Sequence, residues 1–295
     1  GEKALDLALE NFEGLHHDVG FMWMHTAVAN YRLTGNPVSR RRGLHAAGLL
    51  AGRFNYAGKF IRAWNLDKTG WMIVDCMMNL SLLYWAGQET GDPRYCQIAN
   101  MHGDTAMREL MRPDGSCNHI VVFDPETGAV AEKPEGQGYG PGSSWSRGQA
   151  WALYGFALAF LHTGRQEYLD TAKRAAHYFI ANVAMTDYVS LVDFRAPKEP
   201  VMWDTTAAAC AACGLLQISD MAPAEERELY RFHGERILRK LTEAYCGWDA
   251  ERDGILQYGT AAYHRQEDRH VPIIYGDYFL TEGLLRLSDK AFMIW

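Results

Sequence analysis

The sequence lacks several features that would assign it to a protein class at once. No hydrophobic run approaches the roughly 18 residues that a membrane-spanning helix needs, and no signal peptide is recognisable, so no membrane partner is predicted. Basic residues are too few for a nucleic-acid partner, because 29 Lys and Arg against 36 Asp and Glu give a net charge of −7. An acidic sugar remains compatible, since a few local arginines can hold a carboxylate.

The motifs of serine hydrolases, nucleotide binding and metal binding are also missing. There is no GxSxG, no P-loop, and no GxGxxG after a strand; the glycine-rich segment 134–142 is interpreted as a flexible rim. His16 and His17 are adjacent, which does not suit joint ligation, so neither a metal nor a cofactor is predicted.

Cysteines are few and dispersed. Cys210 and Cys213 have CxxC spacing, but they lie in the small-residue text AAACAACGLL and no second CxxC exists. We interpret them as packing cysteines of a buried helix. Six scattered cysteines favour a protein of a reducing compartment, and we predict a cytoplasmic location.

A phrase of apolar residues, then Ser or Thr, then Gly or Asp recurs along the chain. Thr34, Thr90 and Thr163 carry the clear copies, and Ser219 and Ser288 carry weaker ones. Gly after Thr is a signal for a helix C-terminus. Each interval between copies can hold two helices and two connections, so the repeat predicts helical hairpins with one long loop each.

Two kinds of helix alternate in this prediction. Five inner helices are apolar nearly all round and should be buried, at 18–33, 70–89, 145–162, 203–218 and 275–287. Five outer helices carry more charge, at 2–12, 38–53, 93–111, 165–183 and 223–244. The long connections all precede inner helices, and long loops are often functional. We predict an all-α fold and a single domain over 1–295, with HIVVFD (119–124) as a short strand in a loop.

Residues suited to chemistry concentrate at the starts of the inner helices. In a ring of hairpins these starts would converge, and carboxylates, arginine and aromatic rings together suit a carbohydrate. They are His17 and Asp18, Asp75, Trp145, Arg147, Gln149 and Trp151, Trp203 and Asp204, and Tyr275, Asp277 and Tyr278.

Each of these residues could instead have a purely structural role. For Asp18, Asp204 and Asp277, a helix cap or another local role is favoured, because each lies at a helix start. Asp75 lies about five residues into an apolar helix, so its carboxylate must face a polar cavity or a partner. Arg147 opposes the helix dipole in a first turn, and either a ligand anion or an internal salt bridge would compensate it.

Several of these segments resemble the unsaturated glucuronyl hydrolases, glycoside hydrolase family 88. The resemblance runs from about His16 to Phe279 and rests on HHDVGFMW, IVDCMMNLSLLYWAGQETGDPRY, FDPETG, SSWSRGQAWALYGFAL and WDTTAAACAACGLL. The family fold is an (α/α)6 barrel of twelve helices. Ten helices are predicted here, and the chain begins at Gly1 rather than Met, so we expect a first hairpin to be absent from this chain.

The resemblance implies a glycoside hydrolase that acts on 4,5-unsaturated uronic acid at the non-reducing end of lyase-generated oligosaccharides. A carboxyl group protonates C4, water adds at C5, and the hemiketal opens and releases the sugar. Asp75 matches the catalytic aspartate. The residues expected to contact the oligosaccharide are His17, Trp23, His119, Trp145, Arg147, Gln149, Trp151, Arg195, Trp203 and Asp204.

A second catalytic aspartate is expected from the resemblance just before SWSRGQAW, where this chain has Gly140, Pro141 and Gly142. Either Asp75 acts alone, or Glu135 or Asp204 substitutes, or the reaction differs. The alternatives are a related barrel enzyme, such as an unsaturated rhamnogalacturonyl hydrolase or a sugar epimerase, and a sugar-binding homologue without turnover.

Overall fold

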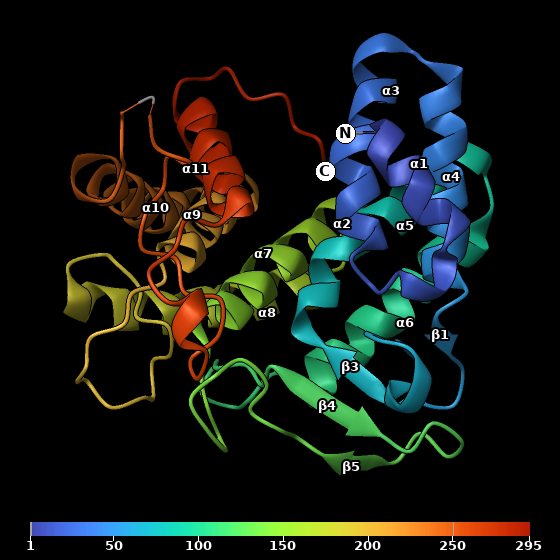
Figure 1. The fold of residues 1–295 in the computed structure, drawn as a ribbon, viewed down its shortest axis with the longest axis horizontal. Coiled ribbons are helices and arrows are strands. Elements are labelled where there is room, and N and C mark those ends of the chain that lie inside the picture. Colours follow the sequence, from blue (N-terminus) through green and yellow to red (C-terminus); the bar gives the residue numbers. More distant parts are fainter. Residues whose placement is uncertain (1, 250) are drawn as a thin grey trace. The chain divides into compact units, whose positions relative to one another are not determined.

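The computed structural model describes residues 2–249 and 251–295, which are mainly helical (Figure 1). Their contacts divide the chain into two compact units, which are described separately below. Unit 1 comprises Gly1–Leu110, Ile120–Glu132 and Phe292–Trp295, and unit 2 comprises Met111–His119 and Lys133–Ala291. The single domain over 1–295 stays a prediction.

Unit 1 contains the first two inner helices and their outer partners. After α1 (Glu2–Glu10) and the turn η1 (Phe12–Gly14), an inner helix runs through α2 (Val19–Trp23), the π-helical η2 (Met24–Val28) and α3 (Ala29–Thr34). The outer helices are α4 (Pro37–Ala51) and α6 (Pro93–Glu109), and α5 (Leu80–Thr90) is the second inner helix. Gly35 and Gly91 end inner helices with positive φ, as the repeat predicts.

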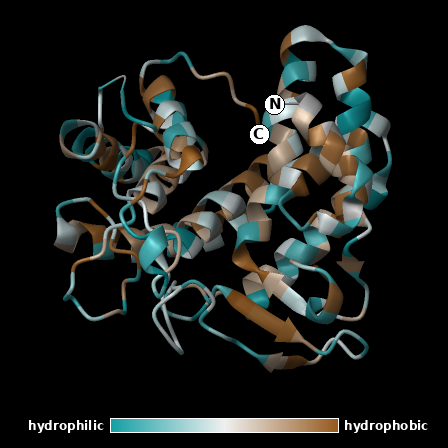
Figure 2. Cartoon of the chain, in the orientation of Figure 1, coloured by the Kyte–Doolittle hydropathy of each residue, from teal (hydrophilic) through white to brown (hydrophobic). Residues whose placement is uncertain are grey.

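Short strands complete unit 1. Strands β1 (Phe54–Asn55) and β2 (Phe60–Ile61) form an antiparallel pair, while β3 (Trp71–Ile73), β4 (Ile120–Phe123) and β5 (Val130–Glu132) form a sheet in that order. The strand expected at 119–124 is therefore confirmed as β4, which is hydrophobic along its length (Figure 2). A short turn, η3 (Leu66–Lys68), lies between β2 and β3.

The inner helix predicted over 70–89 is wrong in its first half. Residues 71–73 form β3, Val74–Asn79 form the 3-10 segment η4, and the α-helix begins only at Leu80. Gly70 admits this pairing, because a Cβ there would lie 1.9 Å from the carbonyl oxygen of Phe123. The β-branched Ile73 fits an extended chain better than a helix. Asp75 is thus a half-buried residue of η4, not a residue inside a helix.

Unit 2 holds three inner helices, α7 (Ser146–Thr163), α9 (Thr205–Met221) and α11 (Ile274–Leu287). Helix α9 packs against both others, with α8 (Gln166–Val183) against α7 and α10 (Ala224–Ala244) against α9 (Figure 1). Short turns η5 (Ala184–Thr186) and η6 (Gln266–Asp268) lie in the connections. Cys210 and Cys213 are fully buried in α9 and form no disulfide bond, which confirms their packing role.

Candidate active site

Four polar side chains of unit 1 gather where α2 begins and η4 ends. Nε2 of His17 lies 3.1 Å from Oδ1 of Asp18, and the amide of Asn79 donates to the same oxygen at 3.4 Å. Asn79 also donates to the backbone oxygen of Asp75 at 3.2 Å and accepts from the N–H of Phe21 at 2.5 Å. We call His17, Asp18, Asp75 and Asn79 the carboxylate cluster.

Gly20 makes this grouping sterically feasible. A Cβ at Gly20 would lie 2.4 Å from the carbonyl oxygen of Asn79 and 2.6 Å from its Cβ, distances that real side chains do not adopt. Only glycine therefore lets α2 approach η4 this closely. The glycine follows the HHDV run directly, so its position in the sequence is linked to that of Asp18.

Asp18 and His17 have the electrostatics of an ion pair. Burial alone raises the pKa of Asp18, but the charge and hydrogen bond of His17, with smaller effects of His16 and Asn79, hold it well below its usual value. Burial alone lowers the pKa of His17, but Asp18, Asp75 and the hydrogen bond to the Ala63 carbonyl raise it above 6.5. Asp18 is therefore ionised at neutral pH, and His17 keeps its proton to higher pH than an ordinary histidine.

Asp75 belongs to the same electrostatic group. Besides its effect on His17, it contributes to raising the pKa of the Cys76 thiol, for which burial is the largest cause and Asp18 the next. Two carboxylates from different segments, Asp18 and Asp75, therefore act on the same neighbours. Such a pair, held in two different settings, is a common basis for proton transfer.

Of the structural roles favoured for Asp18 from the sequence, the structure contradicts the helix cap. Asp18 occupies the N-cap position of α2, but its side chain makes no capping hydrogen bond and joins the carboxylate cluster instead. Asp204, in contrast, does cap α9 by accepting from the N–H of Ala207. The one available signal for Asp18 was the pair of histidines directly before it, since a cap needs no such partners.

His16 completes a group of three possible ligands. One ligand atom each from His16, His17 and Asp18 lies within 4.8 Å of the others, although adjacent histidines are not expected from the sequence to ligate together. The chain itself joins these groups, because Nδ1 of His16 lies 3.4 Å from Asp18 and Nε2 of His17 lies 3.1 Å from it. We therefore interpret them as a hydrogen-bonded group.

In unit 2, the start of α7 gathers aromatic and cationic side chains. The ring of His119 lies 4.4 Å from that of Trp145, and the guanidinium of Arg147 lies 4.9 Å from the Trp145 ring and 5.6 Å from the ring of Tyr275. Nδ1 of His119 accepts from the N–H of Gln137 at 3.0 Å. We call His119, Trp145, Arg147 and Tyr275 the aromatic cluster.

Arg147 has an internal partner. It is fully buried, its Nη1 lies 3.4 Å from a carboxylate oxygen of Asp204, and its Nη2 donates to the carbonyls of Thr260 and Ala261 at 3.1 and 2.7 Å. Burial raises the pKa of Asp204, although Arg147 and backbone N–H groups oppose that shift. The sequence left two partners open for the positive charge of Arg147, a ligand anion or an internal salt bridge, and this structure contains the salt bridge.

The remaining sequence candidates also make contacts within the protein. Gln149 is buried and donates to the carbonyls of Gly115 and Ala175 at 2.8 and 3.1 Å. Arg195 pairs with Asp114 at 2.5 Å and donates to the carbonyl of Gly142 at 3.0 Å. Their contact with a sugar stays a prediction.

Three tryptophans complete the sequence candidates. Trp23 is buried in unit 1. In unit 2, the rings of Trp151 and Trp203 lie 5.6 Å from Phe279 and 6.3 Å from Tyr245 respectively. Packing accounts for these contacts, and a role in sugar binding stays a prediction for each of them.

The C-terminal part of the glycine-rich segment 134–142 is held by hydrogen bonds to Asp193. Asp193 is buried and accepts from the N–H groups of Tyr139 and Ser144 at 3.0 and 3.2 Å and from the hydroxyl of Ser143. A Cβ at Gly138 would lie 2.8 Å from Oδ2 of Asp193. The interpretation as a flexible rim missed this anchor because Asp193 lies some fifty residues further along the chain.

Comparison with known proteins places this geometry in context. The profile of Glycosyl Hydrolase Family 88 matches residues 13–206. An unsaturated glucuronyl hydrolase of Bacillus sp. (strain GL1) is 37% identical over 97% of this chain and 78% of its own length. An unsaturated chondroitin disaccharide hydrolase of Streptococcus pneumoniae is 33% identical over 99% of this chain and 75% of its own.

Solved structures agree with the sequence matches. The crystal structure of the unsaturated glucuronyl hydrolase from Bacillus sp. GL1, described as responsible for the degradation of glycosaminoglycan, superposes with a TM-score of 0.90 at 37% identity, covering 97% of this chain and 77% of that one. Such structures are (α/α)6 barrels, so the predicted all-α barrel class is confirmed. Among the described residues, no helix is long and apolar enough to cross a membrane.

Proposed function

Because this chain belongs to glycosyl hydrolase family 88 and is therefore a glycoside hydrolase, we propose that it removes 4,5-unsaturated uronic acid from the non-reducing end of lyase-generated oligosaccharides by hydrating the double bond. The observation that carries this proposal is the carboxylate cluster, in which Asp18 and Asp75 both act on His17. Hydration of a double bond needs a proton donor and an anionic environment for the charge that develops, and the cluster offers both.

We assign proton transfer to Asp75. Its carboxyl group gives a proton to C4, and positive charge develops at C5 and the ring oxygen, as in other glycosidase transition states. Water then adds at C5 and returns a proton to the Asp75 carboxylate, so the proton balance closes in each turnover. The resulting hemiketal opens, and the rest of the oligosaccharide leaves with a free hydroxyl group.

Asp18 supplies the second carboxylate in this proposal. Its pKa is held low by His17 and Asn79, so it remains an anion while Asp75 exchanges its proton. A fixed negative charge next to the reaction stabilises a cationic transition state. We favour Asp18 over Asp204 for this role, since Asp204 is fully buried against Arg147 in unit 2.

The aromatic cluster of unit 2 is proposed to contact the sugar. Aromatic rings stack on sugar faces, and Trp145 and Tyr275 supply such rings, while the guanidinium of Arg147 between them is paired with Asp204. The cysteines of the described residues form no disulfide bond, which is the basis for our further proposal of a cytoplasmic location.

The assay for this proposal follows the near-ultraviolet absorbance of unsaturated disaccharides from chondroitin, heparin, hyaluronan and pectin-type polymers. Hydration removes the conjugated double bond, so we expect the absorbance to fall with at least one of them. Product analysis then separates this reaction from that of a rhamnogalacturonyl hydrolase or an epimerase. Saturable binding of a uronyl sugar with no loss of absorbance on any substrate would contradict the proposal and favour a binding protein.

A further inference from the structure

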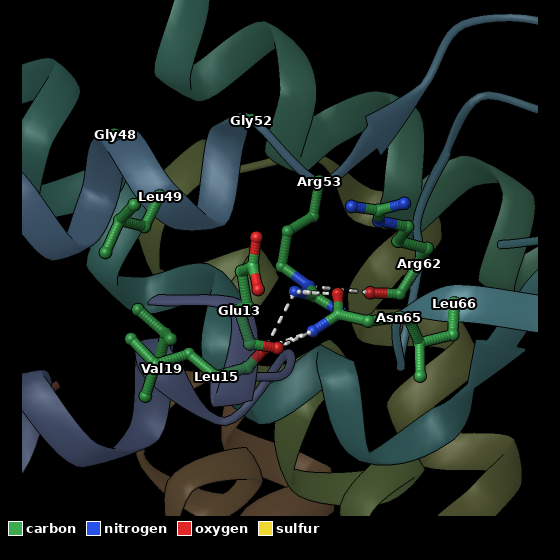
Figure 3. A pocket seen from close by; sticks show the side chains of 10 residues that line it. All are labelled: Glu13, Leu15, Val19, Gly48, Leu49, Gly52, Arg53, Arg62, Asn65 and Leu66. Carbon is green, nitrogen blue, oxygen red and sulfur yellow. Dashed lines mark hydrogen bonds between the residues drawn. The ribbon is translucent and has the colours of Figure 1, made fainter. Parts of the chain in front are cut away.

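Unit 1 contains a cavity of about 490 Å³ that the proposed reaction does not use. Its walls come from the end of α4 and from the segments around η1, β2 and η3, and it is drawn in Figure 3. The polar side chains that line it are Glu13, Arg53, Arg62 and Asn65. Two of these four are guanidinium groups and only one is a carboxylate.

Arg53 is fixed rigidly in the wall of this cavity. Its Nε donates to the carbonyl of Arg62 at 3.0 Å, and its Nη1 donates to Leu15 O at 3.0 Å and to Oδ1 of Asn65 at 2.9 Å. Its Nη2 donates to the carbonyl of Ala63 at 3.0 Å. All four acceptors are neutral, so Arg53, which is only 7% exposed, has no carboxylate partner among the described residues.

Arg62 adds a second charge with an unpaired donor. Its Nε is shielded from solvent and has no hydrogen-bond partner among the described residues. In Figure 3 its guanidinium lies apart from the hydrogen bonds that hold Arg53. Burial, followed by the charge of Arg62, lowers the pKa of Arg53 to about 10, so the two groups are close enough to repel each other. A planar fork of unsatisfied N–H donors is the group that binds oxyanions most specifically.

Glu13 is the obvious internal competitor for this charge. It lines the same cavity, but its carboxylate is not within ion-pair distance of Arg53 or Arg62 in the part of the chain that the structure describes. It is exposed at the cavity, so water solvates it. One exposed carboxylate leaves the site with a net positive charge.

We propose that this cavity binds one oxyanion of an acidic glycan, a sulfate ester or a uronate carboxylate, through the guanidinium of Arg62 with Arg53 as a fixed second charge. The site adjoins the carboxylate cluster, because the carbonyl of Ala63 accepts from both Nη2 of Arg53 and Nδ1 of His17. None of the residues that line the cavity belongs to the carboxylate cluster, so the proposal does not depend on the assignment of the reaction.

The test uses the Arg62 Nε–H resonance in nuclear magnetic resonance, with sodium sulfate, sodium glucuronate and neutral glucose as separate probes. Loss of the signal in Arg62→Lys assigns it. We expect a saturable shift with sulfate, glucuronate or both, and none with glucose. Sulfate alone identifies a sulfate ester as the ligand, and glucuronate alone identifies a carboxylate.

Variants make the test specific. Calorimetry should show Arg62→Gln weakening the responding anion at least about tenfold, since a charge-assisted hydrogen bond is lost, and Glu13→Gln strengthening it. Arg108→Gln removes a surface charge of unit 1 that pairs with Glu109 and serves as the matched control, with unchanged affinity expected. The proposal is overturned if the Arg62 Nε–H resonance does not shift with either anion, or if Arg62→Gln binds the anion as tightly as the wild type does. The wild-type titration remains decisive even if a variant folds poorly.

Discussion

Gly20 and Asn79 are in a contact that has no room for a side chain. A Cβ on Gly20 would lie 2.4 Å from the carbonyl oxygen and 2.8 Å from the Cα of Asn79. Asn79 in turn donates to the Asp18 carboxylate and to the Asp75 carbonyl. The spacing of the two carboxylate-bearing segments therefore depends on this backbone contact.

Gly20→Ala is expected to push α2 away from η4 and to lower both activity and stability. Overpacking of this kind costs about 1–3 kcal/mol, and the displaced Asp18 should reduce kcat without affecting any reacting group directly. The measurements are kcat by loss of absorbance and the free energy of unfolding in denaturant. Gly48→Ala is the matched control, because nothing lies within 4 Å of a Cβ there. Equal behaviour of the two variants would show that the contact does not set the cluster geometry.

Asp75→Asn is expected to abolish turnover while the protein stays folded. An amide cannot donate the proton to C4, and general acid catalysis contributes about 10²–10⁴-fold, so kcat should fall by at least that factor. Asp67→Asn alters an exposed carboxylate of η3 and is the control, with kcat unchanged. The thermal midpoint of each variant checks folding. Substantial turnover by Asp75→Asn would remove Asp75 from the mechanism.

The ion pair of His17 and Asp18 predicts a particular dependence of stability on pH. The pKa of His17 is raised above 6.5, so its contribution is complete below that pH and is lost as the pH rises through the folded-state pKa. The pKa of Asp18 is lowered, so its contribution is present above the pKa of an unfolded aspartate, and it is lost as the pH falls through the folded-state pKa.

His17→Gln should therefore destabilise the protein most at mildly acidic pH and least at alkaline pH. The free energy of unfolding, measured in denaturant across this range, gives the difference from wild type, and a nuclear magnetic resonance titration of the His17 imidazole gives its pKa directly. A difference that grows toward alkaline pH, or an imidazole that titrates below 6.5, would contradict the ion pair.

Arg147→Met tests whether Arg147 is an internal anchor. It leaves the buried Asp204 carboxylate without its cation, and breaking a buried pair costs about 3–5 kcal/mol. Adding Asp204→Asn should restore part of that loss, since the uncompensated charge is removed. Chemical denaturation of the single and double variants measures both effects. If Arg147 only bound substrate, KM would rise and the free energy of unfolding would not change.

The sequence alone determined the helical scaffold and the family. Apolar periodicity and Gly after Thr are local signals, and they located α4, α7, α8 and α10 to within about two residues of their observed ends. Asp75 also stood out, because a carboxylate in apolar text must have a polar partner wherever it lies. The resemblance to the family rests on motifs of consecutive residues. Such motifs can be recognised without knowing which segments are in contact in the folded chain.

Only the tertiary structure decided what each polar residue does. Residues 71–79 look helical by composition, but pairing with β4 holds the first of them extended, because strand formation depends on a partner far along the chain. For Asp18 the sequence favoured a helix cap or another local role, and the structure shows contacts with His17 and Asn79. For Arg147 it left a ligand anion or an internal salt bridge open, and the structure contains the salt bridge to Asp204. Contacts between segments some sixty residues apart produce no periodic pattern in a sequence. The carboxylate cluster therefore follows only from the tertiary contact between Gly20 and Asn79.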